Sequence, residues 1–107
     1  MSREATELAV TFAALGDSRR ISLIDKLYHA EALSVSELCS GMDVSRQAVS
    51  KHLRILADAQ LVLSRKAGRE VLYSLEKQKL SAANAFLKHV DQKWDNAFDR
   101  LKTHLEN

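Results

Sequence analysis

Hydrophobic residues recur every three or four positions along most of this 107-residue chain, and their spacing falls to two only in residues 61–75. The sequence contains no proline and three glycines, so few positions interrupt helices. This pattern predicts a mostly helical fold with one small β-hairpin. Because domains usually contain roughly 100–150 residues, we expect residues 1–107 to form a single domain.

The first two predicted helices are separated near Gly16. The first occupies residues 1–15. Asp17 or Ser18 is expected to cap the second, since short polar side chains accept hydrogen bonds from the free N–H groups at a helix start. We expect the second helix to pack inward through hydrophobic residues at helical spacing: Ile21, Ile24, Leu27 and Tyr28.

Residues 34–59 are predicted to form two helices across a tight turn. Ser34 and Glu37 have the spacing of a capping box, in which each side chain accepts a hydrogen bond from the other residue's backbone N–H. Ser45 is expected to cap the next helix, which runs to about residue 59. This pair of helices is typical of a helix-turn-helix.

A hairpin is predicted in residues 61–75, because residues 61–65 and 71–75 are rich in strand formers. Residues 66–69 form the expected tip, where Gly68 is free to adopt a positive φ. Together with the preceding helices, the hairpin predicts a winged helix-turn-helix: four helices, two strands and a last helix over residues 77–106.

Positive charge is concentrated in residues 45–70, which hold six Lys and Arg against two acids, a net of +4 in a chain whose total is +2. On a helical wheel, Val49, His52, Leu53 and Leu56 point inward, and the five residues that gather on the opposite side between positions 46 and 54 include no acid. A basic helix fits the major groove of DNA, where Arg and Lys contact guanine and Gln contacts adenine. The outward residues expected at DNA are Arg46, Gln47, Ser50, Lys51 and Arg54.

Further contacts to double-stranded DNA are expected on either side of this face. Ser45 and Ser50 suit phosphate oxygens, helped by the positive end of the helix. Arg65, Lys66 and Arg69 of the hairpin are expected to reach flanking phosphates or the minor groove.

The last predicted helix is too long for one small domain to cover. Residues 80–106 would extend for about 40 Å, and their hydrophobic stripe includes Trp94 and Phe98. A second copy of the chain is therefore expected to pack against the stripe and form a homodimer. The residues expected at the interface are Leu8, Phe12, Leu87, Val90, Trp94, Phe98 and Leu101.

Several functional classes are not expected. No hydrophobic run approaches the roughly 20 residues of a membrane span, and residues 1–7 do not form a signal peptide. The single Cys39 excludes an intrachain disulfide and fits a reducing cytoplasm. With no catalytic constellation and no phosphate-binding glycine loop, we expect neither an enzyme nor a cofactor, but a cytoplasmic, nucleoid-associated protein.

Four segments resemble the ArsR/SmtB family of bacterial repressors: residues 15–20 (LGDSRR), 33–38 (LSVSEL), 44–53 (VSRQAVSKHL) and 68–75 (GREVLYSL). The resemblance covers residues 8–76. It implies a homodimeric winged-helix repressor on an inverted-repeat operator, with the first and last helices as the dimer interface.

Two positions depart from the family pattern. Ser18 stands where the family often has proline, and serine is also tolerated at the start of a helix. Gln60 replaces the glycine that usually ends the recognition helix, and a left-handed backbone there would cost about 1 kcal/mol.

The ligand positions of the family's metal sensors are mostly absent. Ser34 and Ser36 stand at the two thiolate positions of one site. In the last helix the matching frame gives Asp91, Lys93, His104 and Asn107, so a cation replaces one ligand. We therefore expect no bound metal.

Two other functions stay open from the residues alone. A winged-helix module could use the basic face on an acidic protein, or an architectural protein could bind DNA with little sequence preference. The sequence does not identify the operator, the regulated genes or an effector, nor does it separate repression from activation.

Overall fold

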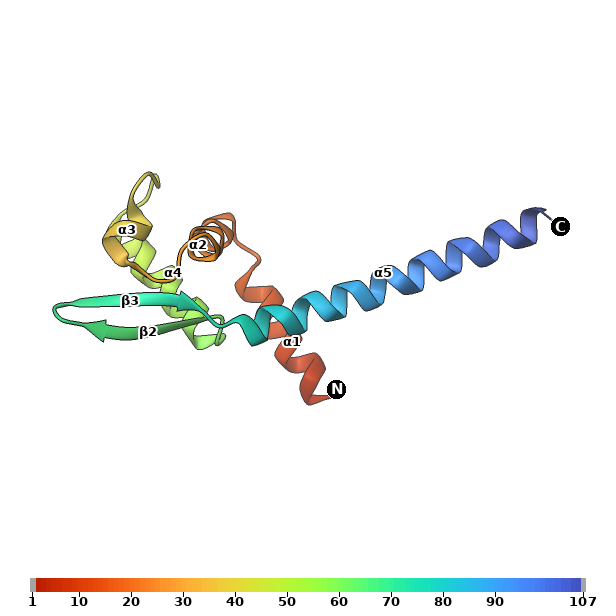
Figure 1. Ribbon diagram of the computed structural model, residues 1–107, viewed down its shortest axis with the longest axis horizontal. Helices are drawn as coiled ribbons and strands as arrows, with labels where there is room; N and C mark the ends of the chain where they lie inside the picture. The colour runs from red at the N-terminus through yellow and green to blue at the C-terminus, as the bar shows by residue number, and fades with distance from the viewer. Residues whose placement is uncertain (1, 107) are drawn as a thin grey trace.

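The computed structural model describes residues 2–106, which form five helices and three strands (Figure 1). In chain order these are α1 (Arg3–Ala14), α2 (Ser18–Tyr28), β1 (Leu33–Ser34), α3 (Val35–Cys39), α4 (Arg46–Asp58), β2 (Val62–Ala67), β3 (Glu70–Leu75) and α5 (Lys77–Glu106). The predicted winged helix-turn-helix order is confirmed, with one additional strand, β1. No helix within residues 2–106 is long and apolar enough to span a membrane.

A body and an arm make up the molecule. Helices α1 to α4 and the sheet gather at one end, and α5 projects away from them, so the chain measures 68 × 31 × 21 Å (Figure 1). The first turns of α5 pack against the body, on α1 and, through Leu80, on the core. The arm therefore exposes most of its length in a single chain.

The core lies between α2, α3 and α4. Its fully buried side chains include Leu23, Leu38, Leu53, Leu56 and Leu61. Burying a side chain of this size stabilises the fold by roughly 1.5–3 kcal/mol relative to leaving it exposed. This packing fixes which face of α4 points outward.

The predicted inward face of α2 is wrong for two residues. Ile21 is 54% exposed and Tyr28 74% exposed, whereas Leu23 is fully buried beside Leu27. Hydrophobic residues cover a wide arc of this helix, and packing against α4 selects the side that carries Leu23 and Leu27. Ile24 lies at the edge of that side and is half-buried.

The sheet has the antiparallel order β1-β3-β2. The short strand β1 pairs with β3 through Leu33 and Tyr73, a partner 40 residues later in the chain. In the hairpin, Ala67 pairs with Glu70 around a two-residue turn whose Gly68 has the predicted positive φ, +66°. Lys66 lies in β2 opposite Val71, so the predicted four-residue tip is wrong and the strands are longer.

Local hydrogen bonds fix the helix starts as predicted. The Asp17 carboxylate accepts from the backbone N–H of Arg19 at 2.8 Å and caps α2. The capping box of Ser34 and Glu37 is complete, with both hydrogen bonds formed at the start of α3. In addition, Lys26 of α2 donates through Nζ to two carbonyl oxygens at the end of α3, at 2.8 and 2.6 Å. These contacts hold the helix-turn-helix against α2.

Candidate nucleic-acid interface

The outer face of α4 is fixed by its cap and by its buried opposite side. Ser45 Oγ accepts a hydrogen bond from the backbone N–H of Ala48 at 3.1 Å. Val49, Leu53 and Leu56 are fully buried, as predicted. The five residues predicted to face DNA are all exposed, and together they line one shallow concavity: Arg46, Gln47, Ser50, Lys51 and Arg54.

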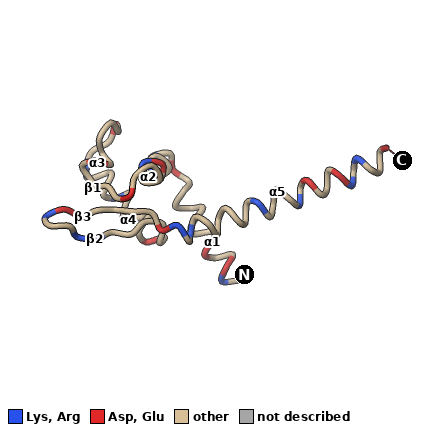
Figure 2. The backbone as a smooth tube through the Cα atoms, viewed as in Figure 1, with Lys and Arg blue, Asp and Glu red and all other residues tan. Residues whose placement is uncertain are grey.

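Within residues 2–106, the cations of this face and of the hairpin are not paired with acids. In the described part of the chain, Lys or Arg residues of α4, β2 and the hairpin turn form no ion pair with a carboxylate. Figure 2 shows the hairpin cations in blue along β2 and around the turn. The acid next to them in the chain is Glu70, the first residue of β3. Their charge is therefore available to an anionic partner.

The three hairpin cations do not share one surface. Arg65 and Lys66 are consecutive in β2, so their side chains leave opposite faces of the hairpin. Arg69 lies in the turn between the strands. All three are exposed. The hairpin thus presents positive charge on both faces and at its end.

His52 joins α4 to the preceding helices. Its Nδ1 lies 3.3 Å from Nη1 of Arg20, and Nε of Arg20 donates to the Ala14 carbonyl oxygen at 2.6 Å. His52 is half-buried and hydrogen-bonded, as expected from its place on the inward face. Arg20 carries no signal in the sequence, because an arginine in the first turn of a helix is too common to indicate a contact with a residue 32 positions later.

The carboxylate of Asp17 lies beside this contact. Its pKa is lowered from the ordinary value of 3.8, chiefly by the hydrogen bond from the backbone N–H of Arg19. The N–H and charge of Arg20 and the nearby His52 lower the pKa further, while partial desolvation acts in the opposite direction. Asp17 therefore stays ionised next to Arg20.

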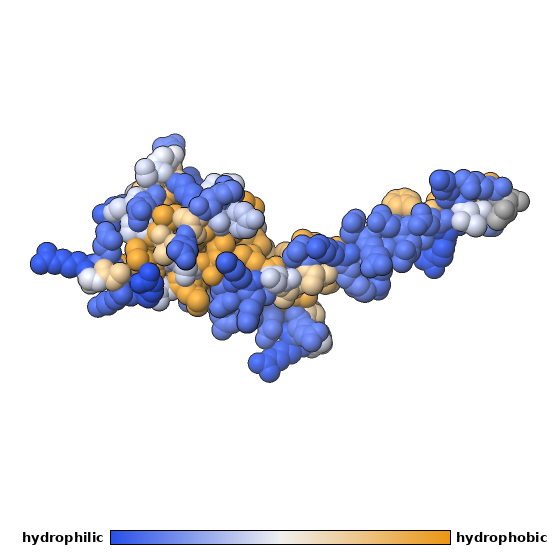
Figure 3. All heavy atoms as spheres, in the orientation of Figure 1, coloured by the Kyte–Doolittle hydropathy of each residue, from blue (hydrophilic) through white to orange (hydrophobic). Residues whose placement is uncertain are grey.

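The predicted interface residues of α5 are mostly exposed along the arm. Trp94 is 61% exposed and Phe98 62% exposed, and their ring centroids lie 6.1 Å apart. Leu87 and Leu101 are also exposed, whereas Val90 is half-buried. Figure 3 shows hydrophobic surface where α5 leaves the body and again along the arm.

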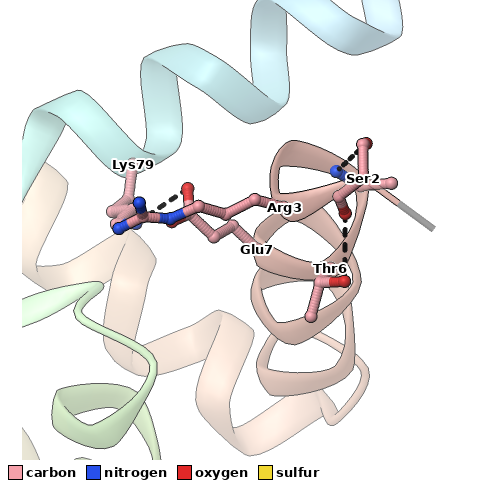
Figure 4. Close-up of polar contacts among 6 residues, drawn as sticks. Ser2, Arg3, Thr6, Glu7 and Lys79 are labelled. Carbon is pink, nitrogen blue, oxygen red and sulfur yellow. Dashed lines mark hydrogen bonds and ion pairs between the residues drawn. The ribbon is translucent and has the colours of Figure 1, made fainter.

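On α1, the predicted interface residues Leu8 and Phe12 are half-buried. Phe12 faces Phe86 of α5 with ring centroids 6.0 Å apart. Glu7 also points from α1 toward Lys79 of α5, at 3.7 Å (Figure 4). Phe86 was not among the predicted interface residues, although it follows Ala83 at helical spacing. These contacts join α1 and α5 within one chain.

The side chains at the family's metal-ligand positions do not come together within one described chain. In the structure of residues 2–106, no three His, Cys, Asp or Glu side chains lie close enough to hold a metal ion. Asp91 and His104 are 13 residues apart on α5, which separates them by about 20 Å along the helix. Asn107 lies outside the described residues. Cys39 is half-buried, with Sγ 3.5 Å from the Val44 carbonyl oxygen.

Comparisons with known proteins agree with this architecture. A family model described as a helix-turn-helix domain matches residues 15–65. The chain is 39% identical over 84 residues to the HTH-type transcriptional regulator Rv2034 of Mycobacterium tuberculosis, covering 78% of this chain and 75% of that protein. It is 44% identical over 72 residues to the transcriptional repressor SmtB homolog of Synechocystis sp., covering 67% of this chain and 54% of that protein.

A solved structure matches both the body and the arm. The ArsR-like transcriptional regulator from Rhodococcus sp. RHA1 has a TM-score of 0.77 and 36% sequence identity, and the match covers 92% of each chain. Both relatives and this structure are named as regulators of transcription, a class of DNA-binding proteins that are not enzymes. This chain accordingly belongs to the ArsR/SmtB family of winged helix-turn-helix proteins and is a DNA-binding transcriptional regulator.

Proposed function

We propose that the protein is a homodimeric repressor that binds an inverted-repeat operator in double-stranded DNA. The outer face of α4 carries this proposal, because its five exposed residues between Arg46 and Arg54 line one concavity, include no acid and form no ion pair with a described carboxylate. The name of the Synechocystis relative, a transcriptional repressor, favours repression over activation.

In this proposal residues 34–59 act as the helix-turn-helix, and α4 enters the major groove. Arg46, Lys51 and Arg54 contact guanine or phosphate, and Gln47 contacts adenine through its amide. Ser45 and Ser50 donate to phosphate oxygens near the positive start of α4. Base preference therefore depends chiefly on Arg46 and Gln47, which lie in the first turn of α4.

Residues 61–75 act as the wing. Arg65 and Lys66 leave opposite faces of the hairpin. Only one of the two therefore faces the DNA when the wing lies against it. The wing supplies charge to flanking phosphates or the minor groove and adds affinity with little base preference.

Residues 1–15 and 77–106 form the proposed dimer interface. The exposed stripe that contains Trp94 and Phe98 is wide and hydrophobic, and a second copy of α5 would remove it from water. Two-fold symmetry then places the two α4 helices about one turn of DNA apart, roughly 34–36 Å, or a multiple of it. Such a dimer acts on the chromosome, so we place it in the bacterial cytoplasm, with the nucleoid.

The signal that releases DNA does not use the family's thiolate site in this proposal. Ser34 and Ser36 replace the soft anionic ligands, and Ser34 Oγ is already engaged in capping α3. Purified protein should therefore bind no zinc tightly at one ion per chain. Stoichiometric, tight zinc binding would show instead that a metal effector is retained.

Selection of duplex DNA from a random pool tests the proposed function. The purified protein is incubated with the pool at about 0.15 M salt, where non-specific binding is weak. We expect enrichment of an inverted repeat. Salt-sensitive binding to all duplexes without enrichment would favour an architectural protein, and weak binding even at low salt would favour an acidic protein partner.

A further inference from the structure

The contact between Arg20 and His52 has a particular place in the fold. In the described part of the chain it is the one side-chain to side-chain hydrogen bond that joins α4 to another element. The other contacts of α4 with its neighbours are apolar, through residues such as Val49 and Leu56. Apolar packing tolerates small shifts of a helix along its neighbour, whereas a hydrogen bond loses strength within a few tenths of an ångström.

The same guanidinium also binds the end of α1. Arg20 Nε donates to the carbonyl oxygen of Ala14, the last residue of α1, at 2.6 Å. A cation at a helix C-terminus is favoured by the free carbonyl groups and the negative end of the helix dipole. One planar guanidinium group therefore connects the end of α1 with the middle of α4.

Asp17 fixes the backbone at the start of α2, from which the Arg20 side chain extends. Its carboxylate accepts hydrogen bonds from the backbone N–H groups of Arg19 and Arg20, at 2.8 and 3.3 Å. Helix α1 is in turn packed on α5 through Phe12 and Phe86. The helices proposed for dimerisation and the helix proposed for DNA contact are thus connected through Arg20.

We propose that Arg20 is a positioning residue, which fixes α4 against the end of α1 and so sets the distance between the two α4 helices of the dimer. This role rests on the proposed dimeric function. Arg20 need not touch DNA for it. Its loss changes which spacing of half-sites the dimer prefers, in addition to the affinity.

The expected tautomer of His52 follows from the same geometry. A guanidinium only donates hydrogen bonds, so the Nδ1 atom that faces Arg20 carries the lone pair and Nε2 carries the proton. This tautomer is a property of the contact and does not depend on DNA. A ring without this contact populates both tautomers, with Nε2–H the more common, so the contact shows itself as nearly complete occupancy of the Nε2-protonated tautomer.

The chain offers a matched control in Arg19, which neighbours Arg20 and is exposed, with no side-chain hydrogen bond to another described residue. The probes are the inverted-repeat duplex enriched by the wild-type protein and two versions with one base pair added or removed between the half-sites. Arg20→Ala should bind the enriched duplex roughly tenfold more weakly, the scale expected for a lost charged hydrogen bond. It should also discriminate among the three spacings less than the wild type, whereas Arg19→Ala should keep the wild-type spacing preference.

Nitrogen-15 NMR of the His52 ring gives a readout that is independent of DNA. The wild type should show almost only the Nε2-protonated tautomer at pH 8, and Arg20→Ala should move part of the population to the Nδ1-protonated tautomer. If Arg20→Ala does not fold, Arg20→Lys replaces it, since an ammonium group does not span Ala14 and His52 as a fork and should give an intermediate spacing preference.

Each failure has its own signature. If the wild type enriches no inverted repeat, the proposed function is wrong and the positioning role falls with it. If the repeat is enriched but the Arg20 variant keeps the wild-type spacing preference, or the Nδ1 atom of His52 is protonated, the positioning role alone is wrong.

Discussion

The backbone N–H of Leu61 donates to the carbonyl oxygen of Leu56 at 2.9 Å, and this hydrogen bond turns the chain from α4 into the wing. A second bond runs from the N–H of Gln60 to the carbonyl oxygen of Ala57, also at 2.9 Å. Together they form a Schellman motif, in which the residue after the C-cap is left-handed. That residue is Gln60, at φ +61°, so the condition under which the sequence implied strain at this position is met. Leu56 and Leu61 are both fully buried, so the turn is fixed by packing as well.

Gln60→Gly should stabilise the protein. A left-handed backbone costs a residue with a Cβ atom roughly 1–2 kcal/mol, and glycine avoids this while losing more conformational entropy on folding. The net gain in the free energy of unfolding should be about 0.5–1 kcal/mol, measured by chemical denaturation.

The matched control is Gln92→Gly on the exposed, right-handed part of α5, which should instead destabilise the protein by about 0.5–1 kcal/mol. Equal destabilisation by both substitutions would show that Gln60 is not strained.

Two substitutions of Ser45 separate helix capping from DNA binding. Ser45→Ala removes the acceptor for the Ala48 N–H and should lower the free energy of unfolding by about 1 kcal/mol. Ser45→Asp keeps an acceptor at the positive helix end, so it should retain nearly wild-type stability. Its added carboxylate should nevertheless weaken DNA binding at least tenfold, because like charges then face each other.

Thermal unfolding and DNA titration of the two variants check this prediction. An aspartate variant that binds DNA as well as the wild type would place the start of α4 away from the phosphates.

The features that the sequence predicted well are local ones. The cap at Ser45 depends on residues within one turn of the same helix, so its signal lies within a few positions. For Gln60 the sequence implied strain only on the condition of a left-handed backbone, and the structure meets that condition. The outer face of α4 was predicted for a similar reason. One side of this helix is strongly hydrophobic, so the polar residues must lie on the opposite side.

The errors have in common that they depend on distant contacts. Strand β1 forms because Leu33 finds Tyr73 across the sheet, and two residues carry no periodicity of their own. Ile21 and Tyr28 of α2 were predicted to be inward because several hydrophobic faces fit that helix, and only packing against α4 distinguishes them. The contact of Arg20 with His52 was missed for the same reason.

Trp94→Glu should convert the proposed dimer into a monomer. Burying a charge at the centre of a hydrophobic interface should raise the dimer dissociation constant at least roughly thirtyfold, the scale of an interface hot spot. Asn96→Glu is the control, since a residue two positions along a helix points to nearly the opposite side. Analytical ultracentrifugation measures both. If Trp94→Glu leaves the mass unchanged, the exposed stripe has another partner.

Asp17 should make the stability depend on pH in acid. Its pKa is lower in the folded chain than the ordinary 3.8, so the ionised carboxylate stabilises the fold above that pH. The stabilisation is lost as the pH falls through the lower, folded pKa. Asp17→Asn keeps a cap but no charge, so its melting temperature should fall less steeply than that of the wild type below about pH 4. Parallel melting curves of the two proteins against pH would contradict the role of the charge.

In this account α4 recognises the bases and the wing adds affinity. Repeating the DNA selection with Gln47→Ala and Lys66→Ala tests these two roles most directly. The Gln47 variant should lose base preference at one position in each half of the inverted repeat, at a cost of about 1–3 kcal/mol for that base. The Lys66 variant should select the wild-type repeat, bind all duplexes more weakly and show a shallower dependence on salt. A changed repeat with Lys66→Ala together with an unchanged one with Gln47→Ala would contradict the account, because base recognition would then belong to the wing.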